Sequence, residues 1–388
     1  MITQLRCNIL TILAVIPAFL LGAVAPQIGK DLPLELSDVG MAVAVMFTVS
    51  AVTARFLGSV TQAMGFNRGM ALSGGLSASA LLLCGLAQSV SWMFLAFVVA
   101  GLANATAHPA VNAAIAASTH DSRHGLAFGI KQSSVPAATL LCGVAVPGIA
   151  LVVGWRWAFW LFAAAALCLA VGSVMVRSDG EPALRASPES HAGTPDTQLT
   201  GRQMNLLAVI AGTGMAAATS LGVFLVASGV DAGLEAGTAA LIGTLCSSIC
   251  IAMRIALGWL ADRRTIRDGY VLIAVLLAAG ATGHLLLGVA NGSAFLVGAL
   301  VAYGLGWSWT GLLQACVVRD NRAQVATATG RLTVGTSLGA AAGPLVFGLV
   351  VDSFGFAPAW VMAGALSLGA GLFMAGWRLV NRRVVVLV

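Results

Sequence analysis

Twelve long apolar runs are the feature that most constrains how this chain can fold. They cover roughly residues 8–29, 39–61, 69–88, 92–116, 125–148, 157–176, 205–229, 237–259, 269–290, 293–317, 325–351 and 357–377. A helix needs about 20 apolar residues to cross the hydrocarbon core of a bilayer, and each run is close to that length. The runs are about twice as long as membrane β-strands and do not alternate between apolar and polar residues. We therefore predict an all-α membrane protein with twelve transmembrane helices.

The composition excludes several classes of soluble protein. Only 9% of the residues are Asp, Glu, Lys or Arg, against about 25% in soluble domains. The net charge of +6 does not indicate a nucleic-acid partner, because the basic residues are spread thinly and form no stripe. The cysteines and histidines lack metal-ligand spacing, and we find no P-loop or nucleophile elbow. We expect no enzymatic activity, no metal and no cofactor, and a monomer that lies in a lipid bilayer.

The runs fall into two sets of six that repeat each other. The polar stretch from Arg177 to Gln203 separates them, so we predict an N-terminal six-helix bundle (1–176), a cytoplasmic linker (177–204) and a C-terminal six-helix bundle (205–388). The loop segment from Gly58 to Gly65 resembles the segment from Gly258 to Thr265, with an offset of about 200 residues. Such pseudo-symmetric halves are typical of secondary transporters, whose binding sites lie between the repeats near the membrane midplane.

Loop charges indicate the orientation in the membrane. With both termini in the cytoplasm, fourteen Lys or Arg residues lie on the cytoplasmic side, and only Lys30 and Arg156 lie outside. This excess follows the positive-inside rule. We therefore predict a multi-pass protein of the bacterial inner membrane with both termini in the cytoplasm.

Four basic residues lie inside the predicted spans: Arg55, Lys131, Arg254 and Arg331. Arg254 follows Arg55 by 199 positions and Arg331 follows Lys131 by 200, so the placement repeats in both halves. No Asp or Glu falls inside a predicted span, and an unpaired charge in hydrocarbon is costly. An anionic substrate could supply the missing partner, and arginine can bind it bidentately. The alternative is that these long side chains extend to the cytoplasmic interface.

The whole chain resembles the major facilitator superfamily of transporters, with six plus six helices, a central linker and the family's loop motif. The segment Gly258-Trp-Leu-Ala-Asp-Arg263 is a good copy of that G-x-L-a-D-R motif. The first-half copy has Gln62 where the family usually has Asp. The resemblance implies a gating role for the motif residues that remain: Gly58, Gly65, Arg68, Gly258, Asp262 and Arg263.

Within that superfamily, the intramembrane charges resemble those of small-anion transporters. Arg254 is similar to the helix-8 arginine of oxalate/formate and monocarboxylate transporters, and Arg55 with Arg254 is similar to the paired arginines of nitrate/nitrite porters. Arg331 falls on the helix that carries the substrate lysine of the oxalate/formate antiporter. Lys131, in Gly-Ile-Lys-Gln-Ser-Ser-Val-Pro, is similar to the cyanate-porter-like branch. The resemblance implies that all four cations bind substrate.

Five further residues are candidates for substrate binding. His108 could carry a proton or donate to an anion, or it could be a packing residue beside the break at Pro109. Tyr303 and Trp307 are four residues apart and share a helix face, where they could line a cavity or pack between helices. Gln132 and Ser134 lie beside Lys131, although polar residues in spans often only hold helices together.

These features predict a secondary transporter that moves a small anion, such as a carboxylate, cyanate or nitrate, by alternating access. Exchange against a counter-anion and coupling to protons both stay open. The alternative is a drug or metabolite efflux pump of the same superfamily. It is disfavoured because such pumps usually have an acidic residue in the membrane, which the predicted spans lack.

Overall fold

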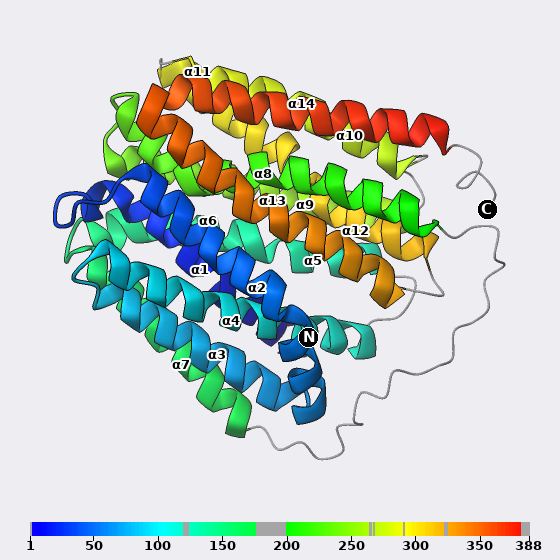
Figure 1. The fold of residues 1–388 in the computed structure, drawn as a ribbon, viewed down its shortest axis with the longest axis horizontal. Helices are drawn as coiled ribbons and strands as arrows, with labels where there is room; N and C mark the ends of the chain where they lie inside the picture. Colours follow the sequence, from blue (N-terminus) through cyan, green and yellow to red (C-terminus); the bar gives the residue numbers. More distant parts are fainter. Residues whose placement is uncertain are drawn as a thin grey trace.

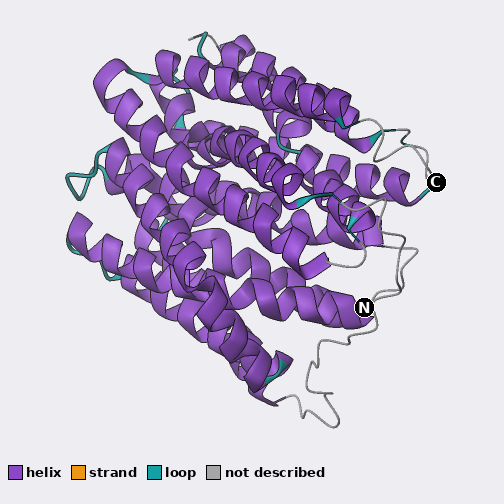
Figure 2. Ribbon diagram, turned by 45° about the vertical axis from the view of Figure 1, so that its right-hand side comes forward, coloured by secondary structure: helices purple, strands orange, loops and turns teal. Residues whose placement is uncertain are grey.

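A computed structural model describes residues 2–118, 124–175, 199–263, 266, 268–289, 292–321 and 325–381. Within these ranges all regular structure is helical, and Figure 2 shows helices joined by short loops without a strand. The prediction of an all-α fold is confirmed for the described residues.

The first half contains six membrane-length segments, of which the fifth is broken. The fifth consists of α5, α6 and a short π-helix, η2. The bounds are α1 (Ile2–Ile28), α2 (Leu36–Met64), α3 (Phe66–Gly85), α4 (Val90–Ser118), α5 (His124–Gln132), α6 (Ser134–Ala145), η2 (Val146–Ala150) and α7 (Trp155–Met175).

The second half also contains six segments, and here the fourth is broken. It consists of α11, the π-helix η4 and α12. The bounds are α8 (Gly201–Asp231), α9 (Ala236–Asp262), α10 (Gly269–Leu287), α11 (Gly292–Val301), η4 (Ala302–Gly306), α12 (Trp309–Asp320), α13 (Val325–Phe354) and α14 (Phe356–Val380).

Eleven of these segments are long and apolar enough to cross a membrane, and α3 is the predicted span that falls outside this set. Its 20 residues are long enough, but its first half is rich in glycine and serine, which lowers the hydropathy. These small residues serve packing, since Ser73 Oγ donates to the Ala103 carbonyl at 2.9 Å. A Cβ on Gly74 would lie 3.1 Å from that of Ala170 in α7. The helix is therefore membrane-length but relies on close helix contact.

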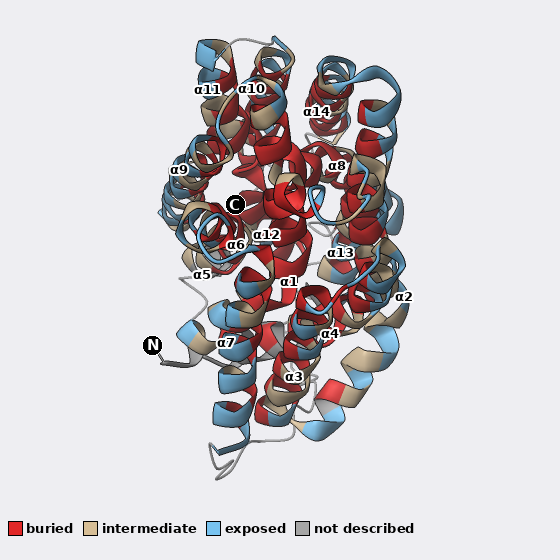
Figure 3. Cartoon of the chain, turned by 90° about the vertical axis from the view of Figure 1, so that its left-hand side faces the viewer, coloured by how far each residue is buried: buried red, intermediate tan, exposed pale blue. Residues whose placement is uncertain are grey.

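The first helix of each half lies at the centre of the molecule. In α1 and α8, 83% and 78% of the most apolar window is buried, against 33% in α7. Figure 3 shows α1 and α8 largely buried at the middle, with exposed residues concentrated on the peripheral helices such as α7. This arrangement agrees with a bundle whose outer helices face lipid.

The helices run roughly parallel, so the molecule has two ends. The N-terminal residues of α1 and the last turn of α14 lie at the same end (Figure 1), which we call the termini end. At the opposite end, Asp31 accepts hydrogen bonds from Trp155 Nε1 at 2.9 Å and Arg156 Nη1 at 3.0 Å. These two donors lower the pKa of the Asp31 carboxyl below its usual value.

The two halves meet at the centre, where α1 contacts α8, and along two seams, α2 with α13 and α5–α6 with α9 and α12. Near the opposite end, α2 and α13 approach so closely that a Cβ on Gly40 would lie 2.2 Å from the Pro344 carbonyl oxygen. Ser37 N also donates to Asp352 Oδ2 at 2.7 Å. The α2–α13 seam is thus closed at the opposite end, and Figure 1 shows these two helices diverging toward the termini end.

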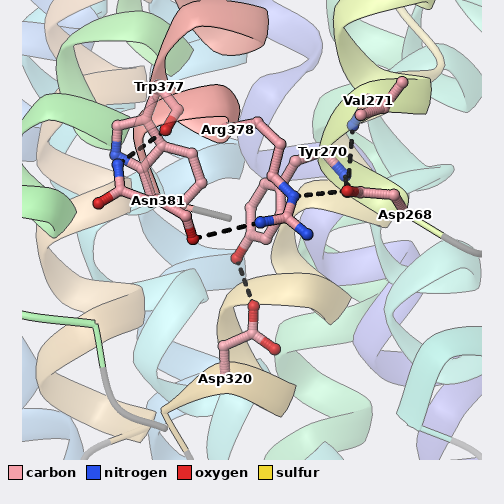
Figure 4. A network of polar contacts seen from close by, with 7 residues as sticks. All are labelled: Asp268, Tyr270, Val271, Asp320, Trp377, Arg378 and Asn381. Carbon is pink, nitrogen blue, oxygen red and sulfur yellow. Dashed lines mark hydrogen bonds and ion pairs between the residues drawn. The ribbon is translucent and has the colours of Figure 1, made fainter. Parts of the chain in front are cut away.

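A polar network holds the second half together at the termini end (Figure 4). Asp268 caps the start of α10 and accepts from Arg378 Nε of α14 at 2.5 Å. Tyr270 donates to Asp320 Oδ2 at 2.8 Å, which ties α10 to the last residue of α12. The ends of α10, α12 and α14 are therefore held as one unit.

Candidate substrate site

Arg254 is the buried charge at the seam between the halves. Its side chain lies on α9 and is only 2% exposed. Nε and Nη2 donate to the Trp307 carbonyl at 3.2 and 2.7 Å, and Nη1 donates to the Gln132 carbonyl. Trp307 belongs to the same half as Arg254, whereas Gln132 belongs to the other half. One guanidinium therefore joins both halves through neutral acceptors.

Both carbonyls are available because their helices are interrupted. The Gln132 carbonyl would normally accept from the N–H of residue 136, but residue 136 is proline and has no N–H. α5 ends at Gln132 and α6 begins at Ser134. Trp307 follows the π-helix η4 directly, where the regular helical hydrogen bonds are shifted. Breaks in one helix of each half thus supply the acceptors that Arg254 needs.

The Trp307 ring lies beside the guanidinium and packs in turn on two further aromatic rings. The Trp307 ring lies 5.6 Å from Arg254 Cζ, 5.2 Å from the Tyr303 ring and 5.9 Å from the Phe19 ring. A cavity beside them is lined by residues of both halves, including Phe19, Tyr303, Thr139 and Gly222. Its volume of about 10 Å³ holds about one water molecule. The site is therefore contracted around its own side chains in this conformation.

Hydroxyl groups accompany the aromatic rings. Thr139 of α6 and Ser247 of α9 share a hydrogen bond across the seam at 2.8 Å. Ser134 Oγ and Thr310 Oγ1 are buried, and in the described part of the chain neither has a hydrogen-bond partner. They follow the carbonyls at 132 and 307 by two and three residues. Buried hydroxyls without partners are uncommon and are available to a ligand.

Lys131 of α5 is also buried, with 3% exposure. Its ammonium group lies within electrostatic range of Cys7 of α1 and His108 of α4. His108 is half-buried. The structure therefore places Lys131 and His108 near each other on α5 and α4.

The structure does not bring Arg55 and Arg331 into this buried group. Both side chains are exposed. Arg331 lies beside the first turn of α8, where a Cβ on Gly201 would meet its Nη1 at 2.7 Å. In each pair of repeat-related cations, one residue is thus buried and the other exposed.

The second-half loop motif makes a direct contact between the halves at the termini end. Asp262 Oδ2 accepts from the backbone N–H of Leu126, in the first turn of α5, at 2.8 Å. A Cβ on Gly129 would lie 2.8 Å from the Arg254 carbonyl oxygen and 3.5 Å from Gly258 Cα. Small residues and a carboxylate at a helix N-terminus therefore close this end of the α5–α9 seam.

The remaining motif residues have local roles in the structure. Gly65 joins α2 to α3 with φ +83°, a conformation that favours glycine. The Arg263 guanidinium lies 3.8 Å from the Trp259 ring. Gly58 is partly buried within α2 and Arg68 is exposed. The side chain of Gln62 lies outside the described residues.

Three contributors to the site were missed from the sequence. Pro136 frees the carbonyl that Arg254 contacts, and its position four residues after Gln132 is the signal that could have revealed this. Gly311 lets α12 approach α5, because a Cβ there would lie 3.3 Å from Gly129 Cα. Phe19 packs on Trp307 from the central helix α1, which no local pattern indicates.

In the described residues no group of three His, Cys, Asp or Glu side chains is arranged to hold a metal ion. The sequence model of the Major Facilitator Superfamily matches residues 7–323. No curated protein matches the chain.

Proposed function

Because the chain belongs to the major facilitator superfamily, a family of secondary transporters, we propose that it moves a small anion across the bacterial inner membrane. The anion is a carboxylate or an inorganic ion such as cyanate or nitrate. The termini end faces the cytoplasm, and transport occurs by alternating access with exchange or proton coupling. The linker between the halves is cytoplasmic.

The burial of Arg254 carries this proposal. The side chain is 2% exposed and, in the part of the chain that the structure describes, it contacts carbonyl oxygens and the Cys250 thiol but no carboxylate. The described acidic residues lie in loops or near helix ends. A buried guanidinium without a counter-charge costs free energy that an anionic ligand would recover.

Competition for the guanidinium supports alternating access. The present ligands of Arg254 are neutral carbonyls, one from each half. An anion forms stronger charge-assisted hydrogen bonds with arginine than a neutral carbonyl does. Its binding would therefore release the link between Gln132 and Arg254 and supply the missing negative charge. The empty carrier keeps this link, which favours exchange over uniport.

The neighbouring residues fit a small, compact substrate. Trp307, Tyr303 and Phe19 offer an apolar wall, and Thr139, Ser134 and Thr310 offer hydroxyls. We assign Lys131 and His108 to charge balance or proton coupling, because Lys131 is buried and lies within electrostatic range of His108. Arg55 and Arg331 remain candidates for attracting anions at the cytoplasmic side, since both are exposed.

Thermal stability of the purified protein tests the proposal. We would screen formate, acetate, lactate, oxalate, nitrate and cyanate against organic cations and neutral drugs. Stabilisation by one or more anions is expected, because a ligand that binds only the folded state raises its stability. Dominant stabilisation by a cation or a neutral drug would overturn the anion assignment and favour efflux.

Counterflow in proteoliposomes then tests exchange. Vesicles preloaded with the stabilising anion should take up labelled anion faster than empty vesicles. The Arg254→Ala variant should lose this uptake. Arg156→Gln is the matched control, since it removes an arginine at the opposite end that pairs with Asp31. Equal loss in both variants would contradict a specific role for Arg254.

A further inference from the structure

A groove on the outer surface of the second half is the feature that the transport mechanism does not use. It lies between the termini-end parts of α8 and α14 and has a volume of about 280 Å³. We propose that this α8–α14 groove binds an anionic phospholipid of the cytoplasmic leaflet. Most of its lining is apolar: Leu206, Ile210, Leu372, Phe373, Gly376 and Val380.

The groove exists because a glycine interrupts a ridge of large apolar side chains. Leu372, Gly376 and Val380 are four residues apart and lie on one face of α14. Leu372 and Val380 are exposed, and a Cβ on Gly376 would meet nothing within 4 Å. The missing side chain leaves a slot between two projecting ones. A linear acyl chain fits such a slot.

The depth of the groove matches a single leaflet. Leu206 and Ile210 follow the start of α8 at Gly201 by five and nine residues. At 1.5 Å per residue they lie about 8 and 14 Å from that helix end. Half of the hydrocarbon core is about 15 Å thick. The groove therefore spans the acyl region of the leaflet at the termini end.

Cationic groups lie at the end of the groove where a headgroup would sit. Arg202 is exposed in the first turn of α8, and Arg331 reaches the backbone of Gly201 next to it. Gln203 Nε2 donates to Asn381 Oδ1 at 2.6 Å, which joins α8 to α14 at this point.

The nearby acidic group does not cancel this charge. Asp268 is bonded to Arg378 (Figure 4), so this pair is neutral overall. The exposed arginines beside the groove therefore keep a net positive charge. The helix N-terminus of α8 adds a partial positive charge at the same place. An apolar slot that ends in arginines matches an acyl chain followed by a phosphate.

Lipid retention by the full-length protein tests this proposal without measuring transport. We would add phosphatidylglycerol or phosphatidylcholine with identical acyl chains to the detergent-solubilised protein and count bound lipids by native mass spectrometry. We expect preferential retention of phosphatidylglycerol. Each arginine near a membrane surface contributes about fivefold to the affinity for anionic lipid, so Arg202→Gln should reduce the preference about fivefold.

A filling variant tests the apolar part of the groove. Gly376→Leu should reduce phosphatidylglycerol binding about tenfold, because the leucine side chain would occupy the slot, where a Cβ meets no atom within 4 Å. Gly369→Leu is the matched control. A Cβ at position 369 also meets no atom within 4 Å, and the position lies two turns away on α14, outside the groove. Lys30→Gln, at the opposite end, is the control for charge.

Two outcomes would overturn the lipid assignment. The first is equal retention of both lipids by the unaltered protein together with unchanged retention in Gly376→Leu. The second is a dimer of the unaltered protein that Gly376→Leu dissociates, which would identify the groove as a contact between two copies of the chain. Neither outcome affects the anion proposal, which depends on the seam between the halves.

Discussion

Replacing Arg254 with methionine separates the effect of the buried charge on folding stability from its effect on anion binding. The Arg254→Met variant keeps most of the side-chain volume but leaves the Trp307 and Gln132 carbonyls without their donor. Two buried acceptors without partners cost about 1–3 kcal/mol each. Removing a buried guanidinium that lacks a counter-charge recovers several kcal/mol of desolvation. These contributions oppose each other, so the free energy of unfolding should change by no more than about 2 kcal/mol.

Anion binding should respond much more strongly than stability. Loss of one partner of a desolvated charge pair costs about 2–5 kcal/mol, which corresponds to at least a 30-fold loss of affinity. The measurements are anion titrations followed by thermal shift, and counterflow in proteoliposomes. Arg254→Lys keeps the charge but not the forked donor geometry of arginine. Its anion affinity should lie between that of the unaltered protein and that of Arg254→Met. A folded Arg254→Met variant whose anion affinity stays within about threefold of the unaltered protein would refute the reasoning.

Three other changes follow from contacts at the seams and inside the second half. Asp262→Asn removes a charge that contributes about 0.3–1 kcal/mol at the N-terminus of α5, so amide exchange in that turn should rise about two- to fivefold; unchanged exchange would contradict the contact. Pro136→Ala supplies a backbone N–H that can donate to the Gln132 carbonyl, which then competes less with an anion for Arg254. Anions should therefore bind about fivefold tighter. Weaker binding in anion titrations would contradict this prediction. Gly339→Ala places a Cβ 1.9 Å from the Gly212 carbonyl oxygen and should lower the free energy of unfolding by about 1–3 kcal/mol. Gly330→Ala on the same helix has open space and should leave the melting temperature unchanged.

The sequence predicted the helical architecture well because hydropathy determines which segments enter a bilayer. Eleven of the twelve predicted spans are membrane-length apolar helices, and α3 differs because glycine and serine replace larger apolar residues where it packs. The breaks between α5 and α6 and within the segment α11–η4–α12 were not predicted. They arise from local hydrogen bonding at Pro136 and in the π-helix η4, which the mean hydropathy of a span does not register.

The sequence shows which helices carry the intramembrane cations but not the direction in which their side chains point. Counting residues from a helix end gives the height of a side chain, whereas the direction turns by about 100° with each residue. Arg254 and Arg55 occupy repeat-related positions in the sequence, yet Arg254 is buried and Arg55 is exposed. Gln132 was a candidate for substrate binding, and in the structure its backbone carbonyl contacts Arg254. Tertiary packing determines both the direction of the arginine side chains and the availability of the Gln132 carbonyl.

The hydrogen bonds from Arg254 to a carbonyl of each half affect how well the membrane keeps its solute gradients. A carrier that could change conformation while empty would let accumulated solute drain back down its gradient. Under the proposed exchange, the guanidinium stays bonded to the Gln132 and Trp307 carbonyls until a competing anion binds. On the proposed mechanism, an idle protein would therefore stay locked, and the cell could keep it in the membrane without dissipating its electrochemical gradients.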